Sequence, residues 1–319
     1  MKKKLLHIMM GTHNPDLQRG LDSVFECYHL DWYPYQHNKS ELQSIILGIK
    51  ETFNPDIVFI HTQSGDVIDI QTLNVLSRNA IVFNWTGDVR HPLPQFYIDI
   101  GRHVTATLFT NMVDVELCNT LGIKADFLQV GFDSAYFNPL GKTDSKYPEI
   151  IFLGSNYPNV FPLSNLRYEM VHDLKNEFGS RFGVYGGGWG DLCNGYIDNY
   201  ADEGIAYRSC KIAINLSHFA YSRYSSDRMF RILGSGAFCL THNFPDLEKD
   251  FVPNKEVVVW NSIDDLKSKI YKYLINDKER ENIALKGCLK ARTNFTWHHF
   301  AKNLKLIIDN IKKEKYEYK

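Results

Sequence analysis

Short, continuous apolar runs alternate along the chain with longer segments in which apolar side chains recur every three or four residues. In the first half, five such runs predict strands, at residues 4–10, 56–61, 80–85, 106–110 and 126–130. The segments between them have the spacing of helices that pack one face on a sheet. Because unbroken apolar strands separated by helices are typical of parallel sheets, this half predicts β-α-β units.

A turn-rich stretch at residues 131–148 interrupts this pattern, and the alternation then restarts. Five further strands are predicted, at residues 149–154, 181–185, 211–217, 237–241 and 256–260, with helices such as 164–178 and 262–274 between them. The restart predicts two α/β domains, each a Rossmann-like, doubly wound parallel sheet. We place the first domain at residues 1–138 and the second at residues 139–296. The length of 319 residues is comfortable for two domains of ordinary size.

Polar residues that can cap helices mark several predicted helix starts. Asn14 can cap the first helix, Ser262 can cap the helix at residues 262–274, and Thr296 can cap a final helix. The final helix carries one apolar stripe.

Composition and charge narrow the class of protein. The chain is 44% hydrophobic and 23% charged, as in an ordinary globular protein. Its 36 basic and 37 acidic residues leave a formal net charge of -1, so a nucleic-acid partner stays open but is not favoured. The six cysteines form no CxxC pair or zinc-like spacing, so no metal site is predicted and a reducing cytoplasm is the expected location. No run of about 18 apolar residues predicts a membrane span.

Candidate chemistry in the first half lies where predicted strands end, because ligands of open parallel sheets bind beyond the carboxyl ends of the strands. Gly11, a candidate donor-binding residue, follows the first strand and permits close approach of the backbone, although no GxGxxG is present. His61 ends another strand, and the next strand is followed by a loop with Asp88 and His91. A carboxylate or imidazole there is a candidate general base, with Asp88 preferred; the alternative for Asp88 is ordinary turn chemistry.

Two glycine-containing loops follow predicted strands in the second half. Gly154 and Ser155 follow the strand at residues 149–154, and the run Tyr-Gly-Gly-Gly-Trp-Gly occupies residues 185–190. Glycines around an aromatic residue let the backbone approach a flat ligand closely. The candidate binding residues in the second loop are Tyr185, Gly186, Gly187 and Trp189. The alternative is a flexible loop without a ligand.

The segment at residues 225–236 contains the strongest candidate for anion binding. Ser225, Ser226 or Asp227 can cap a helix, whose first turn offers unpaired N–H groups and a partial positive charge. Arg228 and Arg231 are three residues apart and share a helix face. Two guanidinium groups at a helix N-terminus suit a diphosphate. The alternative is a capped surface helix whose arginines pair with nearby acids.

Several of these segments resemble group 1 GT-B glycosyltransferases. Residues 131–139, Gly-Phe-Asp-Ser-Ala-Tyr-Phe-Asn-Pro, resemble the connector G-V-D-x-x-x-F-x-P of that family. Residues 228–241 resemble its donor-binding helix and the following strand, and are similar to the spore-maturation-protein (CgeB-like) branch. Residues 294–297, Asn-Phe-Thr-Trp, resemble the F-S/T-W that opens the last helix of the family.

The resemblance implies a GT-B fold, in which two Rossmann-like domains face each other across a cleft. It implies a nucleotide-sugar donor on the second domain, an acceptor mainly on the first, no bound metal, and a final helix, residues 297–319, that packs back on the first domain. Donor contacts would then fall on Gly154, Ser155, the loop from Tyr185 to Trp189, Ser217, Ser226 and Arg228.

One departure from the family concerns the donor ribose. The family has glutamates where this chain has Arg223 and Arg231, and the second of these normally accepts hydrogen bonds from the ribose hydroxyls. A guanidinium cannot accept hydrogen bonds. Asp227 could take over this contact, or Arg231 could bind additional phosphate.

Together, the residues and the resemblance predict a metal-independent glycosyltransferase that uses a nucleoside-diphosphate sugar, with a UDP-sugar as first choice, and no cofactor. The acceptor is left open among a glycan, a protein, a small molecule and modified DNA. Retention of anomeric configuration is favoured by the resemblance; an inverting reaction would need a base such as Asp88. The alternatives are another GT-B enzyme, such as a nucleotide-sugar epimerase, and a non-catalytic nucleotide-sugar-binding protein.

Overall fold

Two parallel β-sheets, one of six strands and one of five, form the centres of the computed structural model, which describes residues 2–11 and 15–317. The chain divides into unit 1, residues 1–131 and 297–319, and unit 2, residues 132–296. The sequence places the first boundary at 138/139, within the segment 128–149 that contains no helix or strand. Within the described residues, no helix is both long and apolar enough to cross a membrane.

The sheet of unit 1 has the strand order β2-β1-β3-β4-β5-β6, and every pair of neighbours is parallel. Its strands are β1 (Lys4–Met9), β2 (Glu26–Asp31), β3 (Ile57–His61), β4 (Ile81–Thr86), β5 (Ala106–Phe109) and β6 (Ala125–Phe127). All were predicted from apolar runs except β2. This edge strand is half exposed, so only Leu30 in it is buried and no continuous apolar run indicates it.

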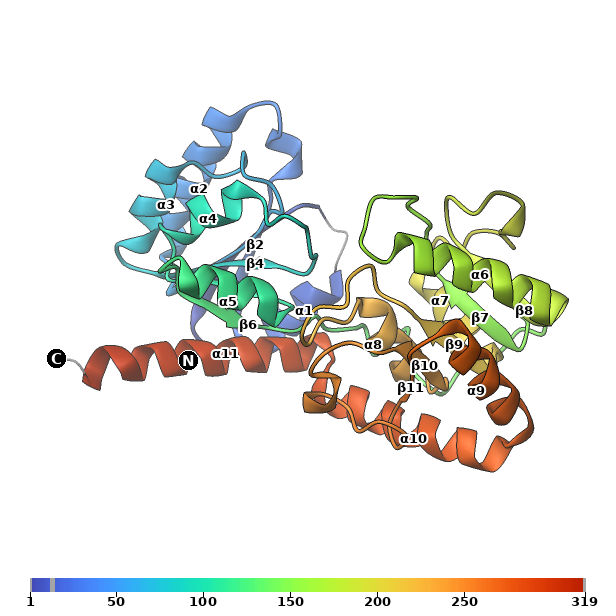
Figure 1. Ribbon diagram of the computed structural model, residues 1–319. Coiled ribbons are helices and arrows are strands. Elements are labelled where there is room, and N and C mark those ends of the chain that lie inside the picture. Colours follow the sequence, from blue (N-terminus) through green and yellow to red (C-terminus); the bar gives the residue numbers. More distant parts are fainter. Residues whose placement is uncertain (1, 12–14, 318–319) are drawn as a thin grey trace. The chain divides into compact units, whose positions relative to one another are not determined.

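Helices cover both faces of this sheet (Figure 1). They are α1 (Pro15–Val24), α2 (Lys39–Phe53), α3 (Ile70–Ser77), α4 (Gln95–Gly101), α5 (Met112–Thr120) and α11 (Trp297–Glu317), with a short 3-10 turn η1 (Tyr33–Tyr35). The predicted cap of α1, Asn14, lies outside the described residues. Helix α11 packs on α1 at Gly20, where an added Cβ would lie 2.5 Å from the carbonyl oxygen of Trp297. The glycine thus permits the close crossing of these two helices.

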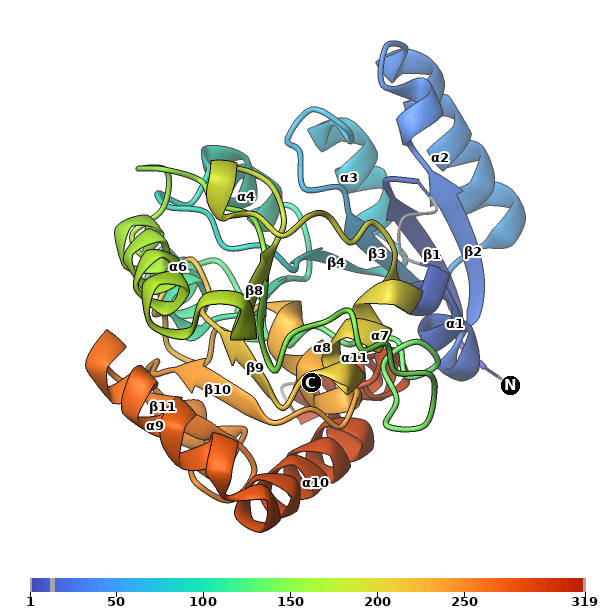
Figure 2. The ribbon, with the colours of Figure 1, turned by 90° about the vertical axis from the view of Figure 1, so that its right-hand side faces the viewer.

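The sheet of unit 2 is also fully parallel, with the order β11-β10-β9-β7-β8 (Figure 2). Its strands are β7 (Ile150–Leu153), β8 (Phe182–Tyr185), β9 (Ile212–Asn215), β10 (Cys239–His242) and β11 (Val258–Trp260). All five strands were predicted from apolar runs, with ends that differ by a few residues. This agreement reflects strands buried on both faces, as parallel sheets require.

The helices of unit 2 are α6 (Ser164–Phe178), α7 (Tyr200–Ser209), α8 (Asp227–Gly234), α9 (Ile263–Ile275) and α10 (Asp277–Asn294). Short 3-10 turns lie at η2 (Gly179–Arg181), η3 (Gly190–Leu192) and η4 (Leu247–Lys249). Helices α6 and α9 pack together on a core that includes Phe152 and Trp260, whereas α7 and α10 both contact α8. Ser262 caps α9 as predicted, since its hydroxyl accepts a hydrogen bond from the N–H of Asp265 at 3.2 Å.

Candidate functional site

A cavity of about 410 Å³ lies in unit 2, at the carboxyl ends of β7 and β8 and the start of α8. Most of the predicted donor residues line it: Gly154, Ser155, Tyr185, Gly186, Gly187, Asp227, Arg228 and Arg231. The remaining lining residues are Leu153, Tyr196, Ile197, Asp198 and Glu203. Two loops and one helix end, far apart in the sequence, therefore meet at the edge of the sheet where a ligand is expected.

The two glycine loops lie against each other. The N–H of Gly154 donates to the carbonyl of Tyr185 at 2.8 Å, and the N–H of Asn156 donates to the carbonyl of Gly187 at 2.8 Å. A Cβ on Gly186 would lie 2.8 Å from the carbonyl carbon and oxygen of Gly154. Glycine at 186 is therefore required by the packing of the loops, in addition to any approach of a ligand.

Trp189, a predicted donor-binding residue, does not line the cavity. Its side chain is buried, and its indole N–H donates to the carbonyl of Gly154 at 2.7 Å. The ring also packs edge-on against Phe152. Trp189 thus holds the loop at residues 185–190 against Gly154 without lining the cavity.

Helix α8 begins at the cavity, with Ser226 as its N-cap residue. The N–H of Ser226 donates to the hydroxyl of Ser217 at 3.1 Å, which ties the helix start to the end of β9. Ser225 is buried, and its hydroxyl bonds to the sulfur of Met229 at 3.1 Å. Ser217, Ser225 and Ser226 therefore shape the helix start without lining the cavity.

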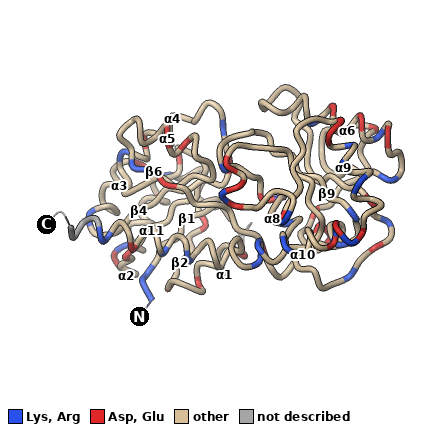
Figure 3. Tube along the Cα trace, turned by 60° about the horizontal axis from the view of Figure 1, so that its bottom comes forward, with Lys and Arg blue, Asp and Glu red and all other residues tan. Residues whose placement is uncertain are grey.

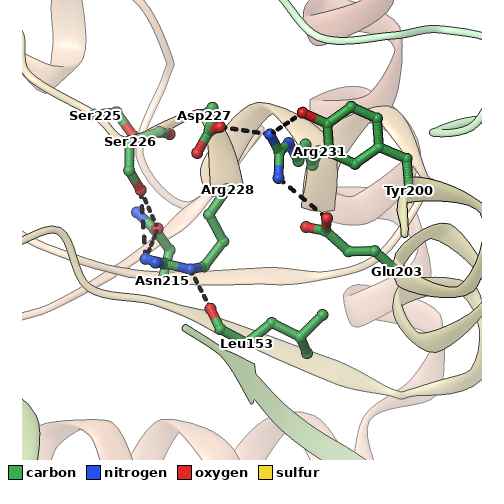
Figure 4. A network of polar contacts seen from close by, with 9 residues as sticks. All are labelled: Leu153, Tyr200, Glu203, Asn215, Ser225, Ser226, Asp227, Arg228 and Arg231. Atoms are coloured by element: carbon green, nitrogen blue, oxygen red, sulfur yellow. Dashed lines mark hydrogen bonds and ion pairs between the residues drawn. The ribbon is translucent and has the colours of Figure 1, made fainter. Parts of the chain in front are cut away.

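Arg228 is held by carbonyl groups and not by a carboxylate (Figure 4). Its Nε donates to the carbonyl of Leu153, and its Nη1 donates to the carbonyl of Leu216 at 3.1 Å and to the Oδ1 of Asn215 at 3.4 Å. Within the part of the chain that the structure describes, neither Asp nor Glu forms an ion pair with it. Its charge is therefore available to an anion in the cavity.

Arg231 has the opposite environment, because acidic and phenolic groups surround it (Figure 4). Its Nη1 bonds to Glu203 at 3.0 Å, and its Nη2 bonds to Asp227 at 2.6 Å and to the hydroxyl of Tyr200 at 3.1 Å. Burial raises the pKa of Glu203, and Arg231 opposes that shift. Both ends of the guanidinium are thus occupied by groups of this chain.

Arg223, at the other position where the family has a glutamate, does not line the cavity. Its Nε and Nη2 contact the two carboxylate oxygens of Asp250 at 3.2 and 2.7 Å. This bidentate pair joins two loops of unit 2. Of the two arginines that line the cavity, Arg228 is therefore the one without an ion pair to an acidic side chain among the described residues.

The candidates for a general base all lie in unit 1. His61 ends β3, while Asp88 and His91 are exposed on the loop between β4 and α4. Because β3 and β4 are neighbours, these residues share the carboxyl edge of one sheet. Gly11, after β1, also lies at that edge, and its N–H donates to the carboxylate of Asp31 at 2.6 Å.

His61 differs from the other two base candidates in its surroundings. Its ring lies 4.6 Å from that of Trp85, and burial lowers its pKa to about 4. A general base works best with a pKa near the working pH, so His61 is a weak base at neutral pH. Asp88 remains the preferred base candidate of this edge.

Sequence reasoning missed several residues around the cavity. Glu203 lies within α7, where its acidic neighbours suggest only a helix start, and residues 196–198 lie in a loop without a motif. Arg167 on α6 is buried behind Gly154 and was missed because α6 reads as an ordinary amphipathic helix. No local sequence pattern could have indicated that Glu203, residues 196–198 and Arg167 lie at or near the cavity.

Residues 167–305 match the family described as glycosyl transferase-like, so the match includes α8 and part of the cavity. Solved structures superpose over almost the whole chain. A glycosyltransferase from Rickettsia africae shares 12% identity with a TM-score of 0.67, covering 98% of this chain and 99% of that one. The fold is GT-B. No curated protein sequence matches the chain.

Two further GT-B structures show the same similarity. Sucrose-phosphate synthase from Thermosynechococcus elongatus has a TM-score of 0.66 at 9% identity, over 98% of this chain and 100% of that one. Anabaena Alr3699/HepE in complex with UDP and glucose has a TM-score of 0.66 at 8% identity, over 97% and 100%. The family match and the shared fold support a GT-B glycosyltransferase, while the CgeB-like branch stays a prediction.

Proposed function

We propose that the chain transfers a sugar from a nucleoside-diphosphate sugar, with a UDP-sugar as first choice, to an acceptor hydroxyl. The observation that carries the proposal is the cavity of unit 2, in which Arg228, which forms no ion pair with a carboxylate within the described residues, lies beside the start of α8. The match to a glycosyl transferase-like family over the same segment supports it.

The chemistry needs positive charge at this place. When the bond between the anomeric carbon and the phosphate oxygen breaks, negative charge develops on the departing diphosphate. Arg228 is already oriented by four acceptor groups, and a helix N-terminus adds N–H groups and a partial positive charge. Groups fixed in advance stabilise developing charge without reorganisation, which allows metal-independent departure.

The nucleoside would occupy the other side of the cavity, against the loop at Gly186 and Gly187. Asp227 is half exposed, and only its Oδ2 bonds to Arg231, so within the described residues its Oδ1 is without a partner. A carboxylate oxygen can accept hydrogen bonds from both hydroxyls of a ribose. We assign Asp227 this contact, in place of the glutamate that other family members have. Structures of similar fold with UDP and glucose or with UDP and GlcNAc support a UDP-sugar.

The acceptor would bind unit 1, and its class is a glycan, a protein, a small molecule or modified DNA. A retaining reaction needs no protein base, and an inverting one would use Asp88 to remove the proton of the acceptor hydroxyl. All six cysteines are free, which agrees with the proposed cytoplasmic location.

The test is release of nucleoside diphosphate from a panel of nucleotide sugars, with and without glycan and small-molecule acceptors. In Arg228→Ala we expect kcat to fall about 100-fold or more, the usual effect of losing a donor to a charged transition state. The matched control is Arg181→Ala, which removes an exposed arginine of the same unit. Unchanged turnover in a folded Arg228→Ala protein would contradict the proposal.

The same panel separates the alternative functions. An epimerase would change the sugar of the donor without releasing nucleoside diphosphate and without needing an acceptor. A non-catalytic binding protein would bind donors, as measured by calorimetry, and would turn none over. Either result with the wild-type chain would overturn glycosyl transfer.

A further inference from the structure

A cluster of three side chains that can bind a metal lies in unit 1, between the end of α1 and the edge strand β2 (Figure 2). Asp22, Cys27 and His29 each offer one ligand atom, and these atoms all lie within 4.8 Å of one another. Cys27 and His29 share one face of β2, because side chains two residues apart in a strand point to the same side. A strand face and a helix end thus bring a thiol, an imidazole and a carboxylate together.

The ring of His29 is oriented by contacts on both of its nitrogens. Its Nε2 lies 3.0 Å from a carboxylate oxygen of Asp22, whereas its Nδ1 lies 3.1 Å from the Nδ1 of His7. Nε2 is therefore the nitrogen that faces the cluster. Ligand atoms at about 2.0–2.3 Å from one tetrahedral ion are about 3–4 Å from one another, so small side-chain rotations would close this cluster around an ion.

His7 has the position of an outer partner to a metal ligand. It lies directly opposite His29 on β1, and its side chain is fully buried. Among the described residues, no group bonds to its Nε2, so its Nδ1 is the nitrogen through which it contacts a neighbour. A histidine that binds a metal through one nitrogen almost always donates its other N–H to an acceptor. His7 supplies that acceptor and leaves the Nε2 of His29 for a cation.

The end of α1 also favours a cation. Asp22 lies in the last turn of this helix, and that turn contains no basic residue. A helix C-terminus carries a partial negative charge, which is unfavourable for a carboxylate and favourable for a bound cation. Lys2 donates to the main-chain carbonyl of Asp22 at 2.6 Å, but its side chain is exposed, so solvent screens much of its charge.

The ligand types select the metal. Thiolate, imidazole and carboxylate are the ligands of zinc, whereas Ca²⁺ and Mg²⁺ prefer oxygen ligands alone. We propose that Asp22, Cys27 and His29 bind one Zn²⁺ ion, with water as the fourth ligand on the exposed side of the cluster. Binding releases the thiol proton of Cys27 to solvent, while neutral His29 keeps its ring proton on Nδ1, toward His7.

The role of the ion is to join the end of α1 to β2 and so to stabilise unit 1. It goes beyond the proposed function, because the departing diphosphate is assigned to a cavity that residues of unit 2 line. The spacing Asp-x4-Cys-x-His matches none of the zinc signatures, which is why the sequence predicts no metal site. The fold brings together ligands that the spacing does not indicate.

Calorimetry of the full chain with Zn²⁺, after treatment with a chelator and its removal, tests the site. We expect one ion to bind, and Cys27→Ser to weaken Zn²⁺ about 100-fold or more, at least the effect of losing an outer partner. Asp22→Ala changes an exposed side chain, so it should fold and should also weaken Zn²⁺. The matched controls are Cys193→Ser, a free cysteine of unit 2, and His37→Gln, an exposed histidine, which should bind like the wild type.

Two further measurements separate this site from nonspecific binding. Co²⁺ absorbs in the near ultraviolet when a thiolate binds it, so the wild type should show this band and Cys27→Ser should not. Zn²⁺ should raise the unfolding temperature of the wild type and leave that of Cys27→Ser unchanged, because only a ligand of the native state stabilises it. His7→Phe should weaken Zn²⁺ about 10–100-fold, whereas a merely structural His7 would change the unfolding temperature without zinc and leave the affinity unchanged.

The wild-type chain and the ligand variants decide the outcome. No binding of Zn²⁺ to the wild type would overturn the proposal. Equal affinity of Asp22→Ala or Cys27→Ser and the wild type would mean an adventitious ion only, and would overturn it too. The test needs no sugar donor, so a chain that binds zinc at this cluster but transfers no sugar keeps the site and loses the proposed function.

Discussion

At the scale of single residues, the arginines near α8 differ in their partners and therefore in what they can do. Arg223 pairs with Asp250, and Arg231 pairs with Glu203 and Asp227, whereas Arg228 bonds to carbonyl and amide oxygens. The first two are neutralised by the chain itself. Only a cation that keeps its charge can stabilise a departing diphosphate, which is why Arg228 is the residue on which the proposal depends.

The pairing of Arg231 leads to a stability prediction. Arg231→Met would leave Glu203 buried without its cation, and we expect the free energy of unfolding to fall by about 3 kcal/mol, as when one partner of a buried pair is removed. Adding Glu203→Gln should recover most of that loss, because the buried charge is then absent. Urea unfolding of both single variants and the double variant measures the coupling. Simple additivity of the two substitutions would show that the pair is not coupled.

The histidine at the end of β3 leads to a pH prediction. Burial lowers the pKa of His61 from 6.5 to about 4, so between these values the unfolded chain binds a proton that the native chain does not. The free energy of unfolding should therefore fall as the pH is lowered through that window, by about 3 kcal/mol from this residue, since one pKa unit is about 1.4 kcal/mol.

Urea unfolding at pH 7 and pH 4 checks this prediction. His61→Phe should lose less stability than the wild type over that range, while the exposed control His37→Gln should follow the wild type. Parallel curves for His61→Phe and the wild type would contradict the assignment of the pH dependence to this imidazole.

At the scale of elements, the strands were easier to predict than the residues from other elements that lie near their ends. Buried strands of parallel sheets are continuous apolar runs, so ten of the strands could be located from the sequence, and β2 could not because its exposed face breaks the run. The start of α8 could be narrowed to three residues, and Ser226 occupies the N-cap position, although its side chain forms no capping hydrogen bond. Glu203 lines the cavity and Arg167 lies behind Gly154 because the tertiary fold brings them there, and no spacing along the chain encodes such contacts.

The contact between α1 and α11 leads to a prediction about glycine. Alanine normally favours a helix interior over glycine by about 1 kcal/mol. At Gly20 a Cβ would lie 2.5 Å from the carbonyl oxygen of Trp297, so we expect Gly20→Ala to destabilise the chain by about 1–3 kcal/mol through overpacking.

The matched control is Gly48→Ala in α2. A Cβ there would meet no atom within 4 Å, so this variant should be more stable than the wild type by about 0.5–1 kcal/mol. Urea unfolding midpoints compare the two variants. A gain in stability for both would show that α11 does not require a glycine at its contact with α1.

At the scale of the whole molecule, function depends on local arrangement and not on overall charge. Basic and acidic segments are interspersed along both units (Figure 3), and the net charge is -1. Attraction of a doubly charged donor must therefore come from the few groups that converge in the cavity of unit 2. The restart of the β-α alternation made two parallel sheets predictable, because each sheet buries its own strands.

The central claim is that the cavity of unit 2 holds the diphosphate of a nucleotide sugar at Arg228 and the start of α8. The most direct measurement is a crystal structure of the full chain with UDP. The account predicts phosphate oxygens within hydrogen-bond distance of the Arg228 guanidinium, with the nucleoside against Gly186 and Gly187. UDP bound elsewhere, or a cavity that stays empty at saturating UDP, would contradict it.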